Sequence, residues 1–319
     1  MVRLEFTIDL DYDVASPADF VFLVAAAETP AQRLVSERLD VSRPAATSWI
    51  TDPHFGNRLL RLHAGAGPLH IAYAAGVDIR HAFADPHAVA ESAIIDIPAD
   101  VLPFLAASRY CQSDRLVPFA HAQFGNVAPG HARVDAIARW VHDHVRFQTG
   151  TSDTSTTALD TLIDRRGVCR DFAHLTIALC RAINIPARFV TGIDYDADPA
   201  LGPCDFHAYA EAWLGDRWYL FDATGISPTT GLVRLGTGRD AADVAFATIY
   251  GDVRTHAPKV AIAAVEDPAK GMRRPQRTPL AVSTATSARP RAPAQPQHDT
   301  PLPLLLHSPL DAAHSHGSR

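Results

Sequence analysis

The sequence predicts an α+β fold, in which a β-rich N-terminal module precedes a core of helices followed by strands. The first observation is an alternation of apolar and polar side chains over residues 2–11, which returns over 69–79 and is typical of half-buried strands. The second is a run of apolar residues at helical spacing within 131–147. The third is that strand patterns follow the helical patterns between 187 and 223, an order typical of α+β folds.

Length and composition narrow the class of protein before any motif is considered. The 319 residues are 47% hydrophobic and 20% charged, as in a globular protein with room for more than one domain. A formal net charge of −6 gives no reason to expect nucleic acid binding. No apolar run approaches the roughly 20 residues that a membrane-spanning helix needs. We therefore expect neither nucleic acid nor membrane among its partners, and the oligomeric state is not readable.

The cysteines and histidines favour reduced thiols and no metal. The four cysteines are sparse and form no CxxC pair, which disfavours a disulfide framework or a cysteine-rich zinc site. Acidic residues interrupt the start of the chain, so no signal-peptide core is visible and the expected location is cytoplasmic. The sixteen histidines show no paired ligand spacing, and we expect neither a metal nor another cofactor.

The N-terminal module is expected to span residues 1–110. Besides the two alternating segments, shorter strand patterns separated by Pro, Gly, Asn and Asp occur at 20–24, 33–39, 58–63 and 93–97. Several short strands with turn signals favour a small β-sandwich or barrel-like module. A scaffolding role is favoured over a dedicated binding role.

The core is expected to span residues 111–264. Its helices are predicted at 131–147, 158–163 and 169–183, and Pro186 prevents continuation of the last one. Strand patterns follow, at 187–193 and in a hairpin of 206–214 and 217–223 around the turn-prone pair Gly215-Asp216.

The remaining residues, 265–319, are expected to be a disordered tail. The stretch after 265 holds nine of the 24 prolines, with Ala, Ser, Thr and Gln between them, and is weakly basic. Such a composition buries too little apolar surface to offset the entropy of ordering. The apolar run 302–306 is a candidate docking motif, but a solvated tail is the favoured interpretation.

Cys169 is the candidate nucleophile. It opens the predicted helix after Gly167, and Arg166 and Arg170 add positive charge beside it. A thiol attacks as its thiolate, and the unpaired N–H groups and dipole of a helix N-terminus stabilise negative charge. A histidine partner would complete the activation of the thiol.

The predicted hairpin supplies that partner. With the turn centred between Gly215 and Asp216, residues 214 and 217 pair, and the same count places Asp222 opposite Tyr209. Because side chains alternate along a strand, His207 shares this face and is a diagonal neighbour of Asp222. A carboxylate there can orient the imidazole, which completes the parts of a thiol-dependent acyl-transfer site. A slip of one residue in the register would break this arrangement.

Other candidate residues have plainer interpretations. The remaining cysteines are expected to be buried small hydrophobes, at 111, 180 and 204. His174 is expected to be a packed helix histidine rather than part of the site, and the acidic cluster 194–198 a solvated loop. Three side chains share the predicted face of His207 and either line a cleft or pack: Tyr209, Glu211 and Trp213.

Together these motifs resemble the transglutaminase-like superfamily, in particular bacterial members with an N-terminal β region. The resemblance runs through the segments 158–159, 166–175, 179–192, 207–213 and 218–224, and covers about 130–250 strongly. It implies a papain-like core in which a nucleophile-bearing helix packs on an antiparallel sheet. By position it makes Cys169 the nucleophile, His207 the general base and later acid, and Asp222 the orienting residue.

The resemblance implies a cysteine hydrolase or peptidase with a Cys-His-Asp triad. We expect hydrolysis of amide or isopeptide bonds in a peptide or protein substrate through a thioester on Cys169. The alternative is a transglutaminase that passes the same thioester to an amine. A third reading is an interaction protein on this scaffold, in which Cys169 is an ordinary thiol. The oxyanion hole should include the backbone N–H of Cys169, and its second donor is not assignable from the sequence.

Overall fold

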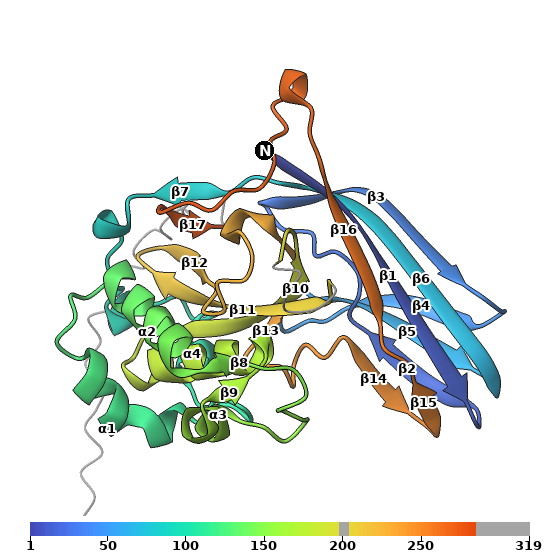
Figure 1. The fold of residues 1–319 in the computed structure, drawn as a ribbon, viewed down its shortest axis with the longest axis horizontal. Helices are drawn as coiled ribbons and strands as arrows, with labels where there is room; N and C mark the ends of the chain where they lie inside the picture. Colours follow the sequence, from blue (N-terminus) through green and yellow to red (C-terminus); the bar gives the residue numbers. More distant parts are fainter. Residues whose placement is uncertain (198–203, 285–319) are drawn as a thin grey trace, which may run out of the picture. The chain divides into compact units, whose positions relative to one another are not determined.

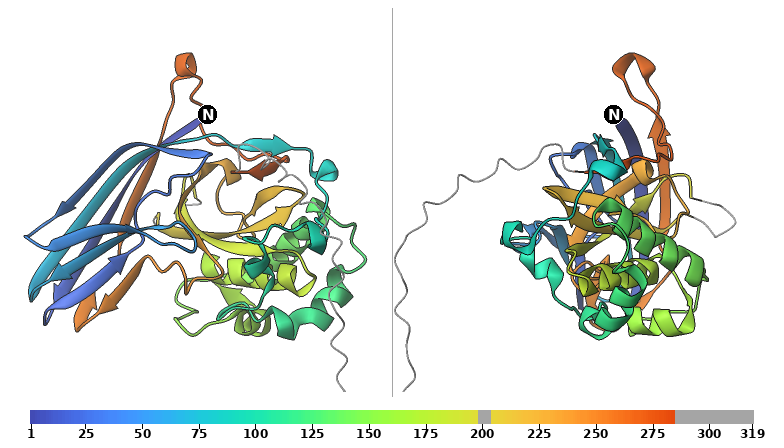
Figure 2. Two further views of the ribbon diagram at one scale, coloured as in Figure 1. Left: turned by 180° about the vertical axis from the view of Figure 1, so that it is seen from behind. Right: turned by 90° about the vertical axis from the view of Figure 1, so that its left-hand side faces the viewer.

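The computed structural model describes residues 1–197 and 204–284, which form helices and mostly antiparallel sheets (Figure 1). Two sheets build the N-terminal module, and a third sheet carries the helices of the core (Figure 2). The predicted α+β class and the strand-rich N-terminal region are confirmed.

The first sheet of the module has the strand order β15-β1-β6-β3, with β16 also paired to β1. Its strands are β1 (Val2–Val14), β3 (Gln32–Val41), β6 (Gly67–Ile79), β15 (Val253–Thr255) and β16 (Lys259–Val265). Every second residue of β1 is buried, because one face of this sheet covers the module's core. The strands predicted from the alternation at 2–11 and 69–79 are therefore present.

The second sheet has the order β14-β2-β5-β4. Its strands are β2 (Ala18–Phe22), β4 (Ala46–Thr51), β5 (Arg58–Ala64) and β14 (Ala247–Tyr250). Aromatic side chains join the two sheets, as where the rings of Tyr12 and Phe20 lie 5.3 Å apart between centroids. This contact between inner faces is that of a two-layer β-sandwich.

Three strands of the module come from a distant part of the chain. Strand β14 pairs with β2, whereas β15 and β16 pair with successive parts of β1. Residues 247–265 therefore belong to the sheets of the N-terminal module, whereas the sequence places residues up to 264 in the core. The reason is that β6 pairs with one edge of β1, and β15 and β16 supply the hydrogen-bonding partners of its other edge.

The strand predicted at 93–97 is absent. The segment forms a short 3₁₀ turn at Ile94–Asp96, and Ile95 is 91% exposed. The run of apolar residues therefore finds no sheet to cover. Similar turns occur at Pro86–Ala88, Leu102–Leu105, Thr229–Gly231 and Pro268–Lys270.

Four α-helices form one layer of the core: α1 (Ser113–Phe124), α2 (His131–His144), α3 (Ala158–Asp164) and α4 (Cys169–Ala182). The last three agree with the predicted helices to within three residues at each end. Helix α1 is not among the predictions, because Pro118 interrupts its sequence pattern. Its buried residues Leu116, Ala120 and Phe124 nevertheless recur at helical spacing.

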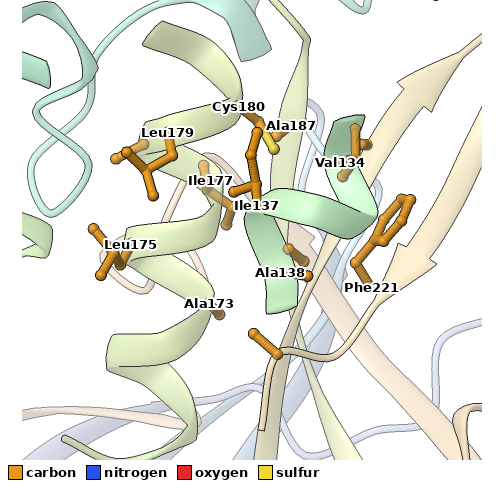
Figure 3. Close-up of a cluster of buried hydrophobic side chains, with 14 of the residues drawn as sticks. Val134, Ile137, Ala138, Ala173, Leu175, Ile177, Leu179, Cys180, Ala187 and Phe221 are labelled. Atoms are coloured by element: carbon orange, nitrogen blue, oxygen red, sulfur yellow. The ribbon is translucent and has the colours of Figure 1, made fainter. Parts of the chain in front are cut away.

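Helix α4 is the centre of the core. Its residues from Asp171 to Ala182 are all buried, and the short strands β8 (Arg146–Phe147) and β9 (Arg166–Gly167) hold the segment before it. Figure 3 shows its side chains packed with Val134 and Ile137 of α2 and with Ala187 and Phe221 of the sheet.

The third sheet is antiparallel, in the order β13-β10-β11-β12-β17-β7. Its strands are β7 (Ala82–Ala84), β10 (Ala187–Asp194), β11 (Phe206–Leu214), β12 (Arg217–Phe221), β13 (Leu232–Gly238) and β17 (Ala281–Ser283). The face of β11 toward α4 carries Ala208, Ala210 and Ala212, whose small side chains allow close approach. Helix and sheet therefore lie in direct contact, and this contact fixes the start of α4 relative to β11.

Strand structure continues beyond residue 265, where the sequence predicts the start of a disordered tail. Strand β17 pairs with β12 and β7, and Ala281, Val282 and Ser283 are buried. This short apolar segment completes the sheet between two strands that need a partner, a contact that the proline-rich composition does not signal. Residues 285–319, including the run 302–306, lie outside the described residues.

Candidate active site

Cys169 stands at the first position of α4 and is partly exposed. The segment before it is fixed: Asp171 Oδ2 accepts a hydrogen bond of 2.8 Å from the backbone N–H of Val168. Gly167 makes this possible, because a Cβ there would lie 2.6 Å from Cβ of Asp171. The thiol therefore projects from a rigid helix N-terminus, where unpaired N–H groups favour negative charge.

The hairpin has the predicted register. Strands β11 and β12 pair from Leu214 with Arg217 to Ala210 with Phe221. The two-residue turn is possible because Gly215 has a φ of +61°, which suits a tight hairpin. One further step in this register takes Tyr209 to Asp222, so His207 and Asp222 are diagonal neighbours as expected.

His207 and Asp222 form a buried ion pair. The Nε2 atom of His207 lies 3.0 Å from Oδ2 of Asp222, and both side chains are 2% exposed. The other carboxylate oxygen of Asp222 accepts hydrogen bonds from the backbone N–H and the hydroxyl of Thr224, at 3.0 and 2.7 Å. Asp222 is thus held on both oxygens, and the imidazole ring has a fixed orientation.

The surroundings favour the charged forms of both residues. Burial opposes ionisation of His207, but the carboxylate of Asp222 and, after it, the neighbouring side chain of Cys169 raise its pKa well above the ordinary value. Burial also opposes ionisation of Asp222, yet His207 and Thr224 together lower its pKa. Both shifts favour the imidazolium form of His207 and the carboxylate form of Asp222.

The structure brings the three predicted side chains together. The Sγ atom of Cys169 lies 3.9 Å from the carbonyl oxygen of Phe206, the residue before His207 on β11, so the thiol stands beside the imidazole. Since Asp222 occupies Nε2, the Nδ1 atom is the ring nitrogen left to exchange a proton with the thiol.

A second carboxylate faces the same imidazole. Oδ2 of Asp194, at the end of β10, lies 3.6 Å from Nδ1 of His207, and its side chain is 5% exposed. Burial and the neighbouring Asp222 raise the pKa of Asp194, although His207 opposes the shift. The expectation that the acidic cluster 194–198 is solvated is wrong for this residue. The signal was the register of β10 on β11, which pairs Gly192 with His207 and puts Asp194 diagonal to it.

The other candidate residues are structural. His174 is fully buried, its Nε2 accepts the N–H of Ala241 at 3.1 Å, and burial lowers its pKa well below the ordinary value. Cys111 and Cys180 are buried, as expected. Cys204 is partly exposed, and burial raises its pKa to about 11.

The residues that share the face of His207 pack rather than line an open cleft. Tyr209 is 1% exposed and Glu211 is 0% exposed. Glu211 forms ion pairs with Arg234 and with Arg188, whose Nε atom lies 2.8 Å from Oε2 of Glu211. These charges sit behind the imidazole and make the strand rigid, since each buried charge has a partner.

Over 1–197 and 204–284, no group of three or more His, Cys, Asp or Glu side chains is arranged to hold a metal ion. In the same part of the chain, none of the helices combines the length and apolar character required to cross a bilayer.

Comparisons with known proteins agree with the fold. Residues 118–223 match the family model described as the transglutaminase-like superfamily. A solved structure from Cytophaga hutchinsonii, described as a "Putative Cysteine Protease", is 37% identical, with a TM-score of 0.81 over 88% of this chain and 97% of that one.

Curated relatives match over a shorter stretch. An uncharacterized Mycobacterium leprae protein is 36% identical over 116 residues, which is 35% of this chain and 42% of the relative. An uncharacterized Mycobacterium tuberculosis protein is 32% identical over 119 residues, 34% of this chain and 38% of the relative. The chain thus spans about two fifths of the curated relatives it matches. With the match to the Cytophaga hutchinsonii protein over nearly its whole length, these findings show that the chain belongs to the transglutaminase-like superfamily.

Proposed function

We propose that the protein is a cysteine hydrolase that cleaves amide or isopeptide bonds in peptides or proteins. The observation that carries the proposal is the buried ion pair between Asp222 and Nε2 of His207, next to the thiol of Cys169 at the start of α4. The superfamily and the description of the Cytophaga hutchinsonii protein support cysteine-dependent acyl transfer or hydrolysis. Hydrolysis is the specific version that we favour.

The reaction starts from the pair in which the thiol proton already resides on His207, and the thiolate of Cys169 attacks the carbonyl carbon of the amide. Negative charge develops on the carbonyl oxygen, where the backbone N–H of Cys169 at the start of α4 is suited to stabilise it. The imidazolium then gives its proton to the leaving nitrogen, the C–N bond breaks, and an amine departs. The acyl group remains on sulfur as a thioester.

In the second half, His207 is neutral and acts as a base. It takes a proton from water as the water oxygen attacks the thioester carbon. When the C–S bond breaks, the thiolate and the imidazolium are restored and a carboxylic acid is released. Asp222 holds the ring through both halves and stabilises its charged form, so that neither transfer requires the ring to turn.

A matched pair of thiol variants tests this proposal. We expect the wild-type chain to release soluble fragments from fluorescein-labelled casein, Cys169→Ala to be inactive, and Cys204→Ala to keep its activity. Far-UV circular dichroism shows whether each variant is folded. Undiminished release by Cys169→Ala contradicts the proposal, and so does a lack of activity in the wild type on both casein and a mixed peptide library.

The transglutaminase alternative is tested in the same assay. Aminolysis and hydrolysis differ only in the nucleophile that reaches the thioester, so the assay adds dansylcadaverine as the amine. We expect carboxylic acid as the product and no more amine incorporation than with Cys169→Ala. Incorporation that accounts for most of the turnover would reassign the protein as a transglutaminase.

The proposal places the reaction in the cytoplasm, where thiols stay reduced. It is supported by the four cysteines, all of which are unpaired in the structure. Cell fractionation with detection of the native protein tests the location, and recovery outside the cytosolic fraction contradicts it.

A further inference from the structure

A basic groove lies where β6 leads into β7 and where the chain approaches β17. It has a volume of about 640 Å³. Five of its lining residues carry a positive charge: Arg80, Lys270, Arg273, Arg274 and Arg277. No Asp or Glu is among the described residues that line it, although the chain as a whole has 35 acidic against 29 basic residues. We call this hollow the basic groove.

The charges of the basic groove are only partly compensated. Lys270 pairs with Asp267 at 2.8 Å but remains 71% exposed, and Arg274 lies 3.8 Å from Asp196 while 53% exposed. Arg80 and Arg273 are exposed, and no side-chain ion pair or hydrogen bond joins them to the rest of the described chain. Like charges gathered in a concave surface repel one another and attract anions, so this arrangement suits a negatively charged ligand.

The walls also offer apolar contact. Phe83, on β7, is 51% exposed, and Leu280, beside β17, is 45% exposed. Burial lowers the pKa of His81 to about 4, so this histidine adds no charge at neutral pH. A ligand that fills the groove can therefore contact arginine guanidinium groups, which bind carboxylates through two parallel hydrogen bonds, together with the side chains of Phe83 and Leu280.

The basic groove continues toward the candidate active site. A second hollow of about 470 Å³ shares Arg277, Thr278 and Leu280 with it. That hollow reaches Asp222, which holds His207, and is also lined by Arg139. The guanidinium of Arg277 is fixed at the junction, where it donates a 2.8 Å hydrogen bond to the carbonyl oxygen of Gly225. The two hollows thus form one surface from β7 to the loop after β12.

We propose that the basic groove binds an acidic peptide segment, one that carries carboxylates with apolar or aromatic side chains between them. A peptide fits better than a nucleic acid, because single-stranded nucleic acid needs a row of aromatic platforms. Within 1–197 and 204–284, Phe83 is the sole Phe, Tyr or Trp in the lining of this groove. If the proposed hydrolase function holds, the groove selects substrates with an acidic segment away from the scissile bond.

Binding is measured on the full chain by fluorescence anisotropy, with a fluorescein-labelled peptide of alternating Glu-Glu-Phe units. The control probe has Lys in place of Glu. We expect the acidic peptide alone to bind, and the affinity to fall as salt rises from about 0.05 to about 0.5 M. We expect Arg80→Glu and Arg273→Glu each to weaken binding about tenfold, as for loss of one charge-assisted contact.

The matched control is Arg61→Glu, which makes the same charge change at an exposed position on β5, outside the groove. Equal weakening by Arg61→Glu and Arg80→Glu would overturn the proposal, because net charge alone would then explain the binding. Equal binding of the Lys peptide would also overturn it. Tight binding of a labelled single-stranded oligonucleotide, with no binding of the acidic peptide, would reassign the groove to nucleic acid.

The same variants separate this proposal from the hydrolase function. Binding is measured in Cys169→Ala as well, where we expect it to be unchanged. If the wild type binds the acidic peptide but hydrolyses nothing, the hydrolase function is contradicted, and the assignment of an acidic peptide to the basic groove still holds. With an active enzyme, Arg80→Glu should raise KM for an acidic peptide substrate and leave kcat unchanged, and an unchanged KM would overturn the role in substrate selection.

Discussion

Oδ2 of Asp194 lies 3.6 Å from Nδ1 of His207, at the ring nitrogen that Asp222 does not occupy. The imidazole therefore stands between two buried carboxylates, and the second one faces the atom that must exchange a proton with Cys169. Two carboxylates this close to one imidazole stabilise its charged form more than one does. Asp194 is for this reason expected to influence the pH at which the site works.

The first prediction concerns Asp194→Asn. Loss of this negative charge favours loss of the proton from His207 and favours a thiolate at Cys169, so both limbs of the pH profile of kcat/KM should move to lower pH. We expect a shift of roughly 0.5–1 pH unit. Asp196→Asn, two residues on and 58% exposed, is the control and should leave the profile in place. Identical profiles for wild type and Asp194→Asn would mean that Asp194 has only a packing role.

The second prediction concerns Asp222→Asn. The amide keeps the shape of the side chain but no longer supports the imidazolium, and kcat should fall by about 10²–10⁴-fold. The hydrogen bonds that Thr224 donates to this side chain can persist, so near-UV circular dichroism should show an intact fold. Activity within twofold of the wild type would show that Asp222 does not orient the base.

The third prediction is a dependence of stability on pH. The pKa of His207 is higher in the folded chain than the ordinary value of about 6.5. The folded chain thus keeps a proton that the unfolded chain releases, and the free energy of unfolding should fall as pH rises from about 6.5 through the raised value. Asp222 acts in the opposite sense, because its lowered pKa gives stability that is lost only in acid.

Thermal unfolding of wild type and His207→Gln between about pH 5 and pH 10 measures this linkage. The wild type should lose more of its midpoint temperature on the alkaline side than the variant does. Parallel curves would show that His207 does not carry a bound proton into the folded state.

The fourth prediction concerns Gly192, where β10 shifts its register on β13 just before Asp194. A Cβ at this position would lie 2.1 Å from the carbonyl oxygen of Val233. Gly192→Ala should therefore destabilise the protein by about 1–3 kcal/mol and displace the end of β10. Gly65→Ala is the control, since nothing lies within 4 Å of a Cβ there. Urea unfolding measures both, and equal midpoints would contradict the close approach.

The three predicted site residues were accessible from the sequence because each depends on local geometry. Cys169 is marked by a glycine and the start of a helix pattern, and a two-residue turn fixes the register between His207 and Asp222. Such signals lie within a few residues of the side chains they position. The two-residue turn at Gly215 left no freedom for a slip.

Features that depend on distant pairing were not accessible. Asp194 reaches His207 through the pairing of β10 with β11, and the connection between these strands is too long for its register to be counted. The return of β14, β15 and β16 to the N-terminal module depends on free sheet edges far away in the sequence. Strand β17 likewise depends on pairing with the distant strands β12 and β7, and the proline-rich composition around it gives no strand signal.

The most direct test of the central claim is the rate at which iodoacetamide alkylates Cys169 as a function of pH, followed by peptide mass spectrometry. A thiol paired with the imidazolium of His207 should react at a constant rate down to well below pH 8, and His207→Ala should abolish this plateau. A rate that simply rises through about pH 8.5 in both proteins, as for a free thiol, would contradict the paired site and with it the proposed reaction.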